Sequence, residues 1–351
     1  MDGRLRDGPE GLEVVVGGDA RQRFYDSGGY GRPLDGNEVA LAPVEAAHLL
    51  FRGDLDAVRD GDDRLDLRAL LGLTGGLSAF VVHRDLRDRG FYCSPARAGW
   101  TPGDAHEGCD VVVYPRGEGP GDGMVAYRLR VVGERDALSV ADLVADPTAL
   151  AVVDEEGEPT YFNCELEGPG GETDRTALEF PTGATADLLA DRAVAWDPPA
   201  ALYERAFFGQ RLAGRNADGG PLQLSLVEAA HLASEGAIAL EAGAVDERGH
   251  AVEGERFGRR LRVYRAMRAA GAVPKSGFKF GADFRAYDSF RSVDEMGHSE
   301  RLVRVVSRSA RLQPRELSLD VRLAGGVRKR MVFAVTDPDS VEWLAARRLT
   351  P

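Results

Sequence analysis

Three side chains that could carry out acid–base chemistry follow one another near the C-terminus. Tyr287, His298 and Lys329 lie 11 and 31 residues apart, inside the segment 277–329. A histidine exchanges a proton near neutral pH, and a lysine is a compact positive charge that can stabilise a developing oxyanion. A phenol, which titrates at about pH 10, is a weak base unless positive charge lies close to it. Each type alone is usually structural, but together they suit proton transfer on a substrate that becomes more negative as it reacts.

The charge of the chain points to the same segment. The protein has 44 Lys and Arg residues against 57 Asp and Glu residues, for a net charge of −13, yet residues 256–351 hold 21 basic and 10 acidic side chains. A basic block inside an acidic protein is the electrostatic signature of a polyanion site. The alternative is that the block pairs with acidic residues of its own chain or of a partner chain.

Two other patterns could carry chemistry but are better explained otherwise. Glu-x-x-His occurs at Glu45–His48 and Glu228–His231, and such pairs bind iron in long four-helix bundles. The segments here are short and followed by glycine, so a structural duplication explains them better. The glycine-rich loop 117–123 lacks the Gly-Lys-Ser/Thr of a phosphate-binding loop. Because no Asp/Glu cluster has metal-ligand spacing, we expect no metal and no cofactor.

Length and composition restrict the class of protein. The chain has 351 residues, which suggests about two domains. It has no apolar run of about 18 residues and no apolar segment near its N-terminus, which argues against a membrane span and a secretory signal. Its three cysteines form no Cys-x-x-Cys pair, so we expect a cytoplasmic protein. Only three basic residues are lysines, a bias typical of proteins from salt-loving archaea or, alternatively, of GC-rich genomes.

A duplicated segment divides the chain. Residues 31–50, GRPLDGNEVALAPVEAAHLL, match residues 214–233, GRNADGGPLQLSLVEAAHLA, at an offset of 183. The match continues at a drifting offset in three further pairs of segments: 82–90 with 263–271, 108–114 with 281–287, and 127–135 with 301–309. The sequence therefore predicts two tandem copies of one unit, separated by a stretch rich in Gly, Pro and Thr.

Each copy is expected to be α+β, with a small α/β subdomain followed by a mixed-sheet subdomain. In the first subdomain, turn signals and the alternating segment LQLSL predict strands before the VEAAHL helix. In the second, Val263, Met267 and Ala270 have helical spacing, and Gly271 is placed to end the helix. The strands expected after this helix are FKFGADFRAY, LVRVVSRSA, LSLDVRLA, KRMVFAVTD and VEWLAARRL.

The match between the copies sets the predicted boundaries. They are about 10–75 and 76–167 for the subdomains of the first repeat (1–167), 168–198 for a linker, and about 199–254 and 255–351 for the subdomains of the second repeat (199–351). The three candidate residues then fall in the last subdomain.

The sequence around the candidate residues has a long and ordered pattern. It reads GxKFGxDFxxY at 277–287, His-Ser at 298–299 and VRxAxxVRK at 321–329, followed by an apolar strand. This pattern resembles the catalytic repeat of archaeal tRNA-splicing endonucleases, and the two-repeat organisation extends the resemblance to the whole chain. The resemblance implies a nuclease-like second subdomain. It also implies metal-independent excision of introns from precursor tRNA at bulge–helix–bulge structures.

The resemblance assigns a role to each candidate residue. Tyr287 would remove the proton of the 2′-hydroxyl that attacks the adjacent phosphorus, His298 would protonate the leaving 5′-oxygen, and Lys329 would stabilise the phosphorane. The products would be a 2′,3′-cyclic phosphate and a 5′-hydroxyl. Two arginines of the family stack on a bulged base, and the matching positions are Arg322 and Arg348, with Arg347 as the neighbouring alternative to the latter.

The first repeat lacks this set. Tyr114 aligns with the candidate tyrosine, but Met124 stands opposite the histidine, and the lysine position falls near Asp146. The resemblance therefore implies a silent first repeat and a homodimer with two active sites. It also implies that the acidic loop of the silent repeat (Asp154, Glu155, Glu156 and Glu158) docks on a basic pocket of the partner. The alternative for this loop is an ordinary solvated turn.

Two other functions stay open on the sequence alone. One is a metal-dependent nuclease, because related nuclease folds use Asp, Glu and Lys. The other is a non-catalytic RNA-binding scaffold subunit, which the intact set of three candidate residues argues against.

Overall fold

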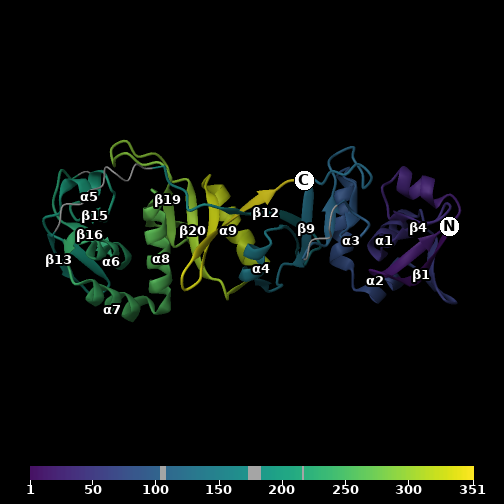
Figure 1. Cartoon of the computed structure of the whole chain (residues 1–351), viewed down its shortest axis with the longest axis horizontal. Coiled ribbons are helices and arrows are strands. Elements are labelled where there is room, and N and C mark those ends of the chain that lie inside the picture. Colours follow the sequence, from purple (N-terminus) through teal and green to yellow (C-terminus); the bar gives the residue numbers. More distant parts are fainter. Residues whose placement is uncertain (103–107, 173–182, 216) are drawn as a thin grey trace.

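The computed structural model describes residues 1–102, 108–172, 183–215 and 217–351. Figure 1 shows an elongated molecule with a small sheet at each end and a long central sheet between them. Within the described residues, no helix is long and apolar enough to cross a membrane. The mixed α/β character agrees with the predicted class.

A ten-stranded mixed sheet forms the middle of the molecule. Its strands are, in spatial order, β18 (Val273–Ser276), β19 (Phe284–Tyr287), β20 (Arg301–Ser307), β22 (Arg330–Thr336), β23 (Val341–Leu349), β12 (Pro159–Glu167), β11 (Ala149–Val153), β9 (Tyr127–Gly133), β8 (Val111–Val113) and β7 (Cys93–Pro95). The pairs β20–β22 and β9–β11 are parallel, and the other neighbours are antiparallel. The predicted strands LVRVVSRSA, KRMVFAVTD and VEWLAARRL correspond to β20, β22 and β23.

The order of elements in the central sheet is symmetric about the antiparallel pair of β12 and β23. In this pair Tyr161 faces Leu349 and Cys164 faces Ala346. A single hydrophobic core contains buried side chains from both sides of the pair. The two halves of the sheet therefore share one core, in addition to backbone hydrogen bonds.

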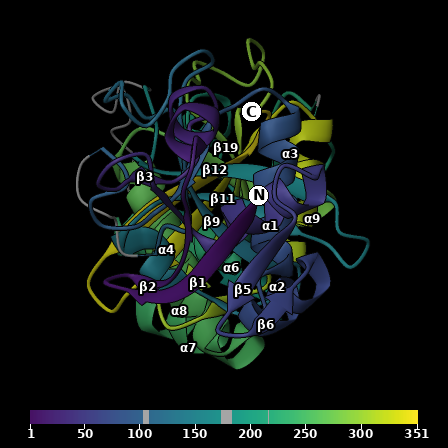
Figure 2. The same cartoon turned by 90° about the vertical axis from the view of Figure 1, so that its right-hand side faces the viewer.

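Two smaller sheets cap the ends of the molecule. The first consists of β3 (Arg32–Pro33), β4 (Val39–Leu41), β2 (Gly11–Val16), β1 (Asp2–Gly8), β5 (Ala57–Asp60) and β6 (Asp63–Leu65). The second consists of β15 (Gln210–Arg211), β16 (Leu222–Ser225), β14 (Arg192–Ala195), β13 (Ala184–Leu188) and β17 (Ile238–Ala239). Figure 2 looks onto the first of these sheets, with strands of the central sheet behind it.

Helices cover the sheets. The longer ones are α1 (Pro43–Arg52), α2 (Leu67–Thr74), α3 (Leu77–Asp88), α6 (Leu226–Ser234), α7 (Ala242–Glu253), α8 (Glu255–Ala269) and α9 (Pro314–Gly326). Shorter elements are η1 (Arg21–Asp26), α4 (Val140–Ala145), α5 (Ala200–Glu204), η3 (Phe278–Phe280) and the paired strands β10 (Leu138–Ser139) and β21 (Arg311–Leu312). The predicted end of α8 is confirmed, because Gly271 follows it with a φ of 91°.

The repeated Glu-x-x-His pattern has a structural role at the start of two helices. Glu45 is the third residue of α1, and its carboxylate accepts hydrogen bonds from the backbone N–H groups of Gly31 and Ala42, both at 2.8 Å. Glu228 holds the same place in α6 and accepts from the N–H of Ser225 at 3.0 Å. Each carboxylate thus satisfies donors at a helix N-terminus, where negative charge is favourable.

One predicted strand is wrong. The segment LSLDVRLA belongs to helix α9, which begins with a proline at its first position. Its alternating apolar residues suggested a strand, but Leu319 and Leu323 are 47% and 45% exposed. The buried apolar residues of the segment are Leu317, Val321 and Ala324. Their spacing of four and three is that of one helix face, so helical packing decides the structure of this segment.

The predicted linker at 168–198 is also too long. β13 and β14 lie inside it, pair with each other and join the second small sheet through β16. The alternating segment at 184–188 buries Ala184 and Ala186, a strand signal that the surrounding Gly, Pro and Thr residues obscure. The second small sheet therefore begins at residue 184, before the predicted start at 199. Residues 173–182 of the predicted linker lie outside the described residues.

Candidate active site

Three segments of the chain meet at one edge of the central sheet, here called the β19–β20–β22 edge. β19 ends at Tyr287, while its neighbour β20 begins at Arg301, and β22 runs parallel to β20 from Arg330. The N–H of Glu300 donates to the carbonyl of Ala286 at 3.0 Å, and the N–H of Arg330 donates to the carbonyl of Glu300 at 3.0 Å. Because these strand ends coincide, residues 287, 298 and 329, which are far apart in the sequence, come to the same edge.

Lys329 is half-buried at this edge. Its ammonium group donates to the backbone carbonyl of Ser299, and Nζ lies 5.7 Å from the ring centroid of Phe280. Burial lowers the pKa of Lys329; Glu300 opposes this change, and Arg285 adds to it. The lysine is thus anchored to the segment that carries His298.

Tyr287 is held by aromatic packing. Its side chain is only 5% exposed, and its ring centroid lies 6.0 Å from that of Phe207 and 6.3 Å from that of Phe290. The guanidinium carbon of Arg285 lies 6.0 Å from the same ring. Antiparallel pairing with Val273 of β18 sets the backbone position. Aromatic packing therefore fixes the ring of Tyr287, and the guanidinium of Arg285 lies beside it.

His298 lies in the segment between β19 and β20, three residues before β20 begins, and it is exposed. Its neighbour Ser299 is buried and accepts the hydrogen bond from Lys329. The segment is tied down at one end by the N–H of Asp288, which donates to Glu300 Oε2 at 2.9 Å. An exposed imidazole next to an anchored residue is accessible to a substrate.

Several residues near the edge were not singled out from the sequence. Arg285 is close to both Tyr287 and Lys329, Phe280 lies beside the lysine ammonium group, and Glu300 accepts from the backbone beside Tyr287. Arg285 and Phe280 belong to the motif at 277–287, so their places in that motif were a usable signal. Glu300 has no such signal, because its contact depends on the pairing of β19 with β20.

The strand register places Tyr114, Met124 and Asp146 of the first half opposite the three candidate residues, as the sequence alignment does. Val111 faces Leu129 in the first half, as Phe284 faces Val303 in the second. Counting from these pairs, Tyr114 takes the place of the candidate tyrosine. The parallel pairs of β9–β11 and β20–β22 likewise put Asp146 in the place of the candidate lysine, and the exposed Met124 precedes β9 as the histidine precedes β20.

The surroundings of Tyr114 also differ from those of its counterpart. It is fully buried, and burial raises its pKa to about 12. Met124 and Asp146 thus stand at the places of the histidine and the lysine, and the surroundings of Tyr114 include Ser94 and Glu45.

The two arginines expected to bind RNA lie on different elements. Arg322 is exposed on α9, at the border of a groove that also contains Arg315 and the acidic loop residues Asp154 and Glu155. Arg348 is exposed on β23, where successive side chains point to opposite faces. Its neighbour Arg347 forms an ion pair with Glu165 at 3.7 Å. This pairing favours Arg348 as the arginine that is free to contact a ligand.

The acidic loop forms the hairpin turn between β11 and β12. The carboxylate of Asp154 accepts from the N–H groups of Glu156 and Glu158 at 3.0 Å and 2.9 Å. Glu155 forms an exposed ion pair with Arg135 at 2.7 Å. Asp154 therefore shapes the turn, and the side chains of Glu156 and Glu158 face solvent.

A basic cleft lies between the second small sheet and β18. Arg192, Arg260, Lys275 and Arg285 line it, together with Glu228, around a cavity of about 350 Å³. Lys275 Nζ lies 2.7 Å from Glu228 Oε1 in a nearly buried ion pair. Burial raises the pKa of Glu228, but Lys275 and backbone donors outweigh this and lower it to about 2. Arg192 and Arg260 are also ion-paired, with Asp191 and with Glu253 and Asp283 respectively, so the cleft contains several partly neutralised arginines.

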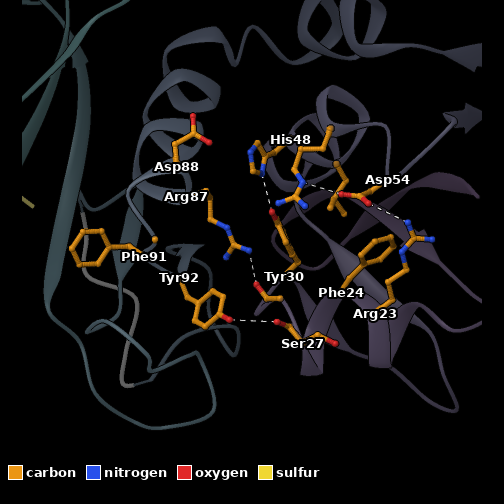
Figure 3. Close-up of a pocket in the computed structure, with 14 residues that line it drawn as sticks. Arg23, Phe24, Ser27, Tyr30, His48, Asp54, Arg87, Asp88, Phe91 and Tyr92 are labelled. Carbon is orange, nitrogen blue, oxygen red and sulfur yellow. Dashed lines mark hydrogen bonds and ion pairs between the residues drawn. The ribbon is translucent and has the colours of Figure 1, made fainter.

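A second cavity, of about 410 Å³, lies in the first half beside the ends of α1 and α3 (Figure 3). Arg23 Nη2 and Arg52 Nε both bind the carboxylate of Asp54, at 3.1 Å and 2.9 Å. The hydroxyl of Tyr30 and Nδ1 of His48 form a hydrogen bond at 2.9 Å. Much of its polar lining is thus paired within the cavity wall.

Arg87 of this cavity has a counterpart in the second half. Its Nη2 donates to the carbonyl of Gly28 at 2.6 Å, and its Cζ lies 3.9 Å from the ring centroid of Tyr30, as Figure 3 shows. Arg268 donates to the carbonyl of Ala206 at 2.7 Å and lies 4.0 Å from the ring centroid of Phe208. An arrangement that occurs in both halves indicates a structural role. The β19–β20–β22 edge is therefore the stronger candidate.

Within the part of the chain that the structure describes, no group of three or more His, Cys, Asp and Glu side chains could hold a metal ion.

Known proteins resemble this chain along its whole length. A family model described as tRNA intron endonuclease, catalytic C-terminal domain, matches residues 257–343, which include the β19–β20–β22 edge. A second model, described as tRNA intron endonuclease, N-terminal domain, matches residues 9–71 and 184–247, which contain the second small sheet and all strands of the first except β1.

Curated full-length proteins agree with these matches. A tRNA-splicing endonuclease of Haloferax volcanii is 57% identical over 353 residues, and one of Natronomonas pharaonis is 55% identical over 361 residues; both alignments cover all of both chains. A tRNA-splicing endonuclease of Methanosarcina acetivorans is 37% identical over 365 residues, covering 97% of this chain and 98% of the relative.

Proposed function

Because the chain belongs to the family of archaeal tRNA-splicing endonucleases, we propose that it excises introns from precursor tRNA with the residues of the β19–β20–β22 edge. The observation that carries this proposal is the convergence of Tyr287, the His298 segment and Lys329 at one edge, with Lys329 bonded to the residue after His298. Haloarchaeal relatives also fit the low lysine content and the acidic surface.

The proposed reaction needs no metal. Tyr287 takes the proton of the 2′-hydroxyl, whose oxygen forms a bond to the adjacent phosphorus. The bond from phosphorus to the 5′-oxygen breaks, and His298 donates a proton to that oxygen. Lys329 stabilises the negative charge of the phosphorane between these two events. The products are a 2′,3′-cyclic phosphate and a 5′-hydroxyl, and the proton on Tyr287 returns to solvent.

Arg322 and Arg348 are proposed to hold a bulged base of a bulge–helix–bulge substrate. Both are exposed, and a planar guanidinium suits stacking on a base. The exposed cationic side chains beside the candidate site suit a phosphodiester ligand. Two bulges in one substrate call for two active sites.

We also propose that the chain consists of two copies of one unit, with the first copy silent, and that it acts as a homodimer. The symmetric order of the central sheet and the equivalent register of Tyr114 and Asp146 support two copies. The acidic loop is expected to dock into the basic cleft of the partner, lined by Arg192, Arg260 and Arg285. The loop carboxylates would complement these arginines, although Arg192 and Arg260 would have to share their present partners Asp191, Glu253 and Asp283.

One experiment separates this function from its alternatives. Purified protein is incubated with an intron-containing precursor tRNA in molar KCl and excess EDTA, and the ends of the fragments are mapped. We expect two cuts that leave 2′,3′-cyclic phosphates. Cleavage that appears only when a divalent metal is restored would indicate a metal-dependent nuclease. RNA binding without any single-turnover cleavage would indicate a scaffold.

A further inference from the structure

Phe278 presents an aromatic ring to solvent two residues before Phe280, whose ring lies near Lys329. Its side chain is 88% exposed, although a ring of this size is usually buried in the core of a folded protein. It lies in η3, the turn between β18 and β19 that contains part of the motif at 277–287. A ring left in water forgoes hydrophobic stabilisation of the fold, which suggests that its partner is a ligand.

The turn that carries this ring has a fixed conformation. A Cβ atom on Gly277 would lie 2.7 Å from the carbonyl oxygen of Ala282, so no larger residue fits there. Gly281 has a φ of +70°, which favours glycine, and its N–H donates to the carbonyl of Phe278 at 3.2 Å. The N–H of Phe280 donates to the carbonyl of Gly277 at 2.8 Å. The backbone therefore fixes the point from which the ring of Phe278 projects into solvent.

The other ring of the turn connects this position to Lys329. The centroid of Phe280 lies 5.7 Å from Lys329 Nζ. Leu323 of α9 lies 3.9 Å from where a Cβ of Gly281 would be, and it is 45% exposed. The turn and the last part of α9 thus form a partly apolar surface beside the candidate catalytic lysine.

Cations are interleaved with this apolar surface. Lys279 follows Phe278 directly, and Arg322 and Arg328 are exposed on and after α9. An exposed ring among cationic side chains is the usual arrangement for binding single-stranded nucleic acid, where the base stacks on the ring and the phosphates meet the cations. A purely apolar protein surface would be poorly matched to so many charges.

We propose that Phe278 is a stacking platform for one unpaired base of the precursor RNA. This inference rests on the proposed function and names a contact that the arginines alone do not supply. Stacking has a particular value at high salt, because added salt weakens phosphate contacts through the loss of counterion release. An aromatic contact therefore suits a protein whose relatives come from haloarchaea.

The test combines protein variants with altered RNA. Dissociation constants are measured in molar KCl for the wild type, Phe278→Ala and Phe278→Trp. The model precursors carry a 2′-deoxynucleotide on the 5′ side of each cut, which removes the attacking 2′-hydroxyl, and one unpaired nucleotide at a time is abasic. Phe51→Ala is the matched control, because Phe51 is 53% exposed on α1 of the first half. We expect Phe278→Ala to weaken binding of the intact precursor roughly 5- to 100-fold, the range for losing one base–aromatic stack. Phe278→Trp and Phe51→Ala are expected to stay close to the wild type.

The abasic series identifies the partner of the ring. At one position only, removal of the base should weaken RNA binding by the wild type. The same abasic RNA should bind to Phe278→Ala about as well as the intact RNA does, because the protein change and the RNA change remove the same contact. An unchanged dissociation constant for Phe278→Ala, or an equal loss at every abasic position, would overturn the inference. A variant that loses dimerisation while its RNA binding is unchanged would show a protein contact instead. If the wild type itself neither binds nor cuts the precursor, the proposed function fails first, which is a different outcome.

Discussion

Replacing Lys275 by methionine tests how a buried carboxylate is kept charged, because the two halves of the chain solve this problem differently. Lys275 and Glu228 form an ion pair at 2.7 Å, with side-chain exposures of 11% and 8%. In the first half, Glu45 holds the place of Glu228, but the strand register puts Ser94 where the lysine would be. Burial raises the pKa of Glu45 to about 7, whereas that of Glu228 is lowered to about 2.

The first half therefore indicates how Glu228 should titrate in the Lys275→Met variant. Without the ammonium group, Glu228 keeps its backbone donors and should titrate near the pKa of about 7 seen for Glu45. Removing one partner of a buried ion pair costs about 3–5 kcal/mol of unfolding free energy when the remaining charge stays ionised. This full cost is expected at about pH 8, where the carboxyl of the variant is charged.

The loss of unfolding free energy caused by Lys275→Met should shrink as the pH falls. A carboxyl whose pKa is raised by folding stabilises the native state while it is protonated, and it loses that contribution as the pH rises through the folded pKa of about 7. Between about pH 7 and pH 5, two units at 1.36 kcal/mol per unit correspond to about 3 kcal/mol. Glu228 of the wild type stays ionised over this range. The difference in unfolding free energy between the wild type and the variant should therefore fall by about that amount.

Urea unfolding in molar KCl, followed by tryptophan fluorescence, measures the difference in unfolding free energy between the wild type and Lys275→Met at about pH 5 and about pH 8. Trp196 reports on the second small sheet, where its ring N–H donates to Asp187 at 2.7 Å. The double variant Lys275→Met with Glu228→Gln is the control, because it removes the titrating group and should recover much of the loss at about pH 8. A loss that is the same at both pH values would refute the argument from Glu45.

The other predictions concern cleavage, recognition and assembly. His298→Ala should slow the chemical step roughly 10²- to 10⁴-fold in single-turnover assays and leave RNA binding nearly intact. His231, whose ring packs between aromatic side chains, provides the control. An equal loss of cleavage rate in His231→Ala would contradict the role of His298 as the acid. Arg322→Lys should weaken RNA binding almost as much as Arg322→Ala, because a lysine keeps the charge but not the planar stacking surface. Full RNA binding by the lysine variant would show that charge alone matters. Replacing all four carboxylates of the acidic loop by serine should weaken the dimer in light scattering across a dilution series and reduce cleavage with it; a variant that stays dimeric and active would identify the loop as a plain surface turn.

The candidate residues were predictable because their signal is local. The motif at 277–287 and the lysine at the end of VRxAxxVRK are short ordered patterns, and their resemblance to the family identifies the candidate residues. Their meeting point was not predictable, because it depends on β20 lying between β19 and β22, an order that strand patterns do not encode. For the same reason the sequence did not reveal that Glu300 accepts from the backbone beside Tyr287.

The wrong strand in α9 has a related cause. Leucine and valine alternate at 317–323, and only the packing of Leu317 and Val321 against the central sheet shows that a helix buries every fourth residue here. Composition caused the error at 184–195 as well, since alanine-rich strands beside glycine and threonine resemble a linker. In both places tertiary packing decided between local structures that the sequence alone supports about equally.

The pairing of β12 with β23 also has a consequence for how the protein is made. Tyr161 and Leu349 face each other in this ladder although 188 residues separate them along the chain. β23 is synthesised after every other described strand, so the edge of β12 stays unpaired while the second half is being translated. An unpaired strand edge is prone to associate with other chains, and contacts between such distant residues form late in folding. The growing chain thus carries an exposed sheet edge until β23 has left the ribosome.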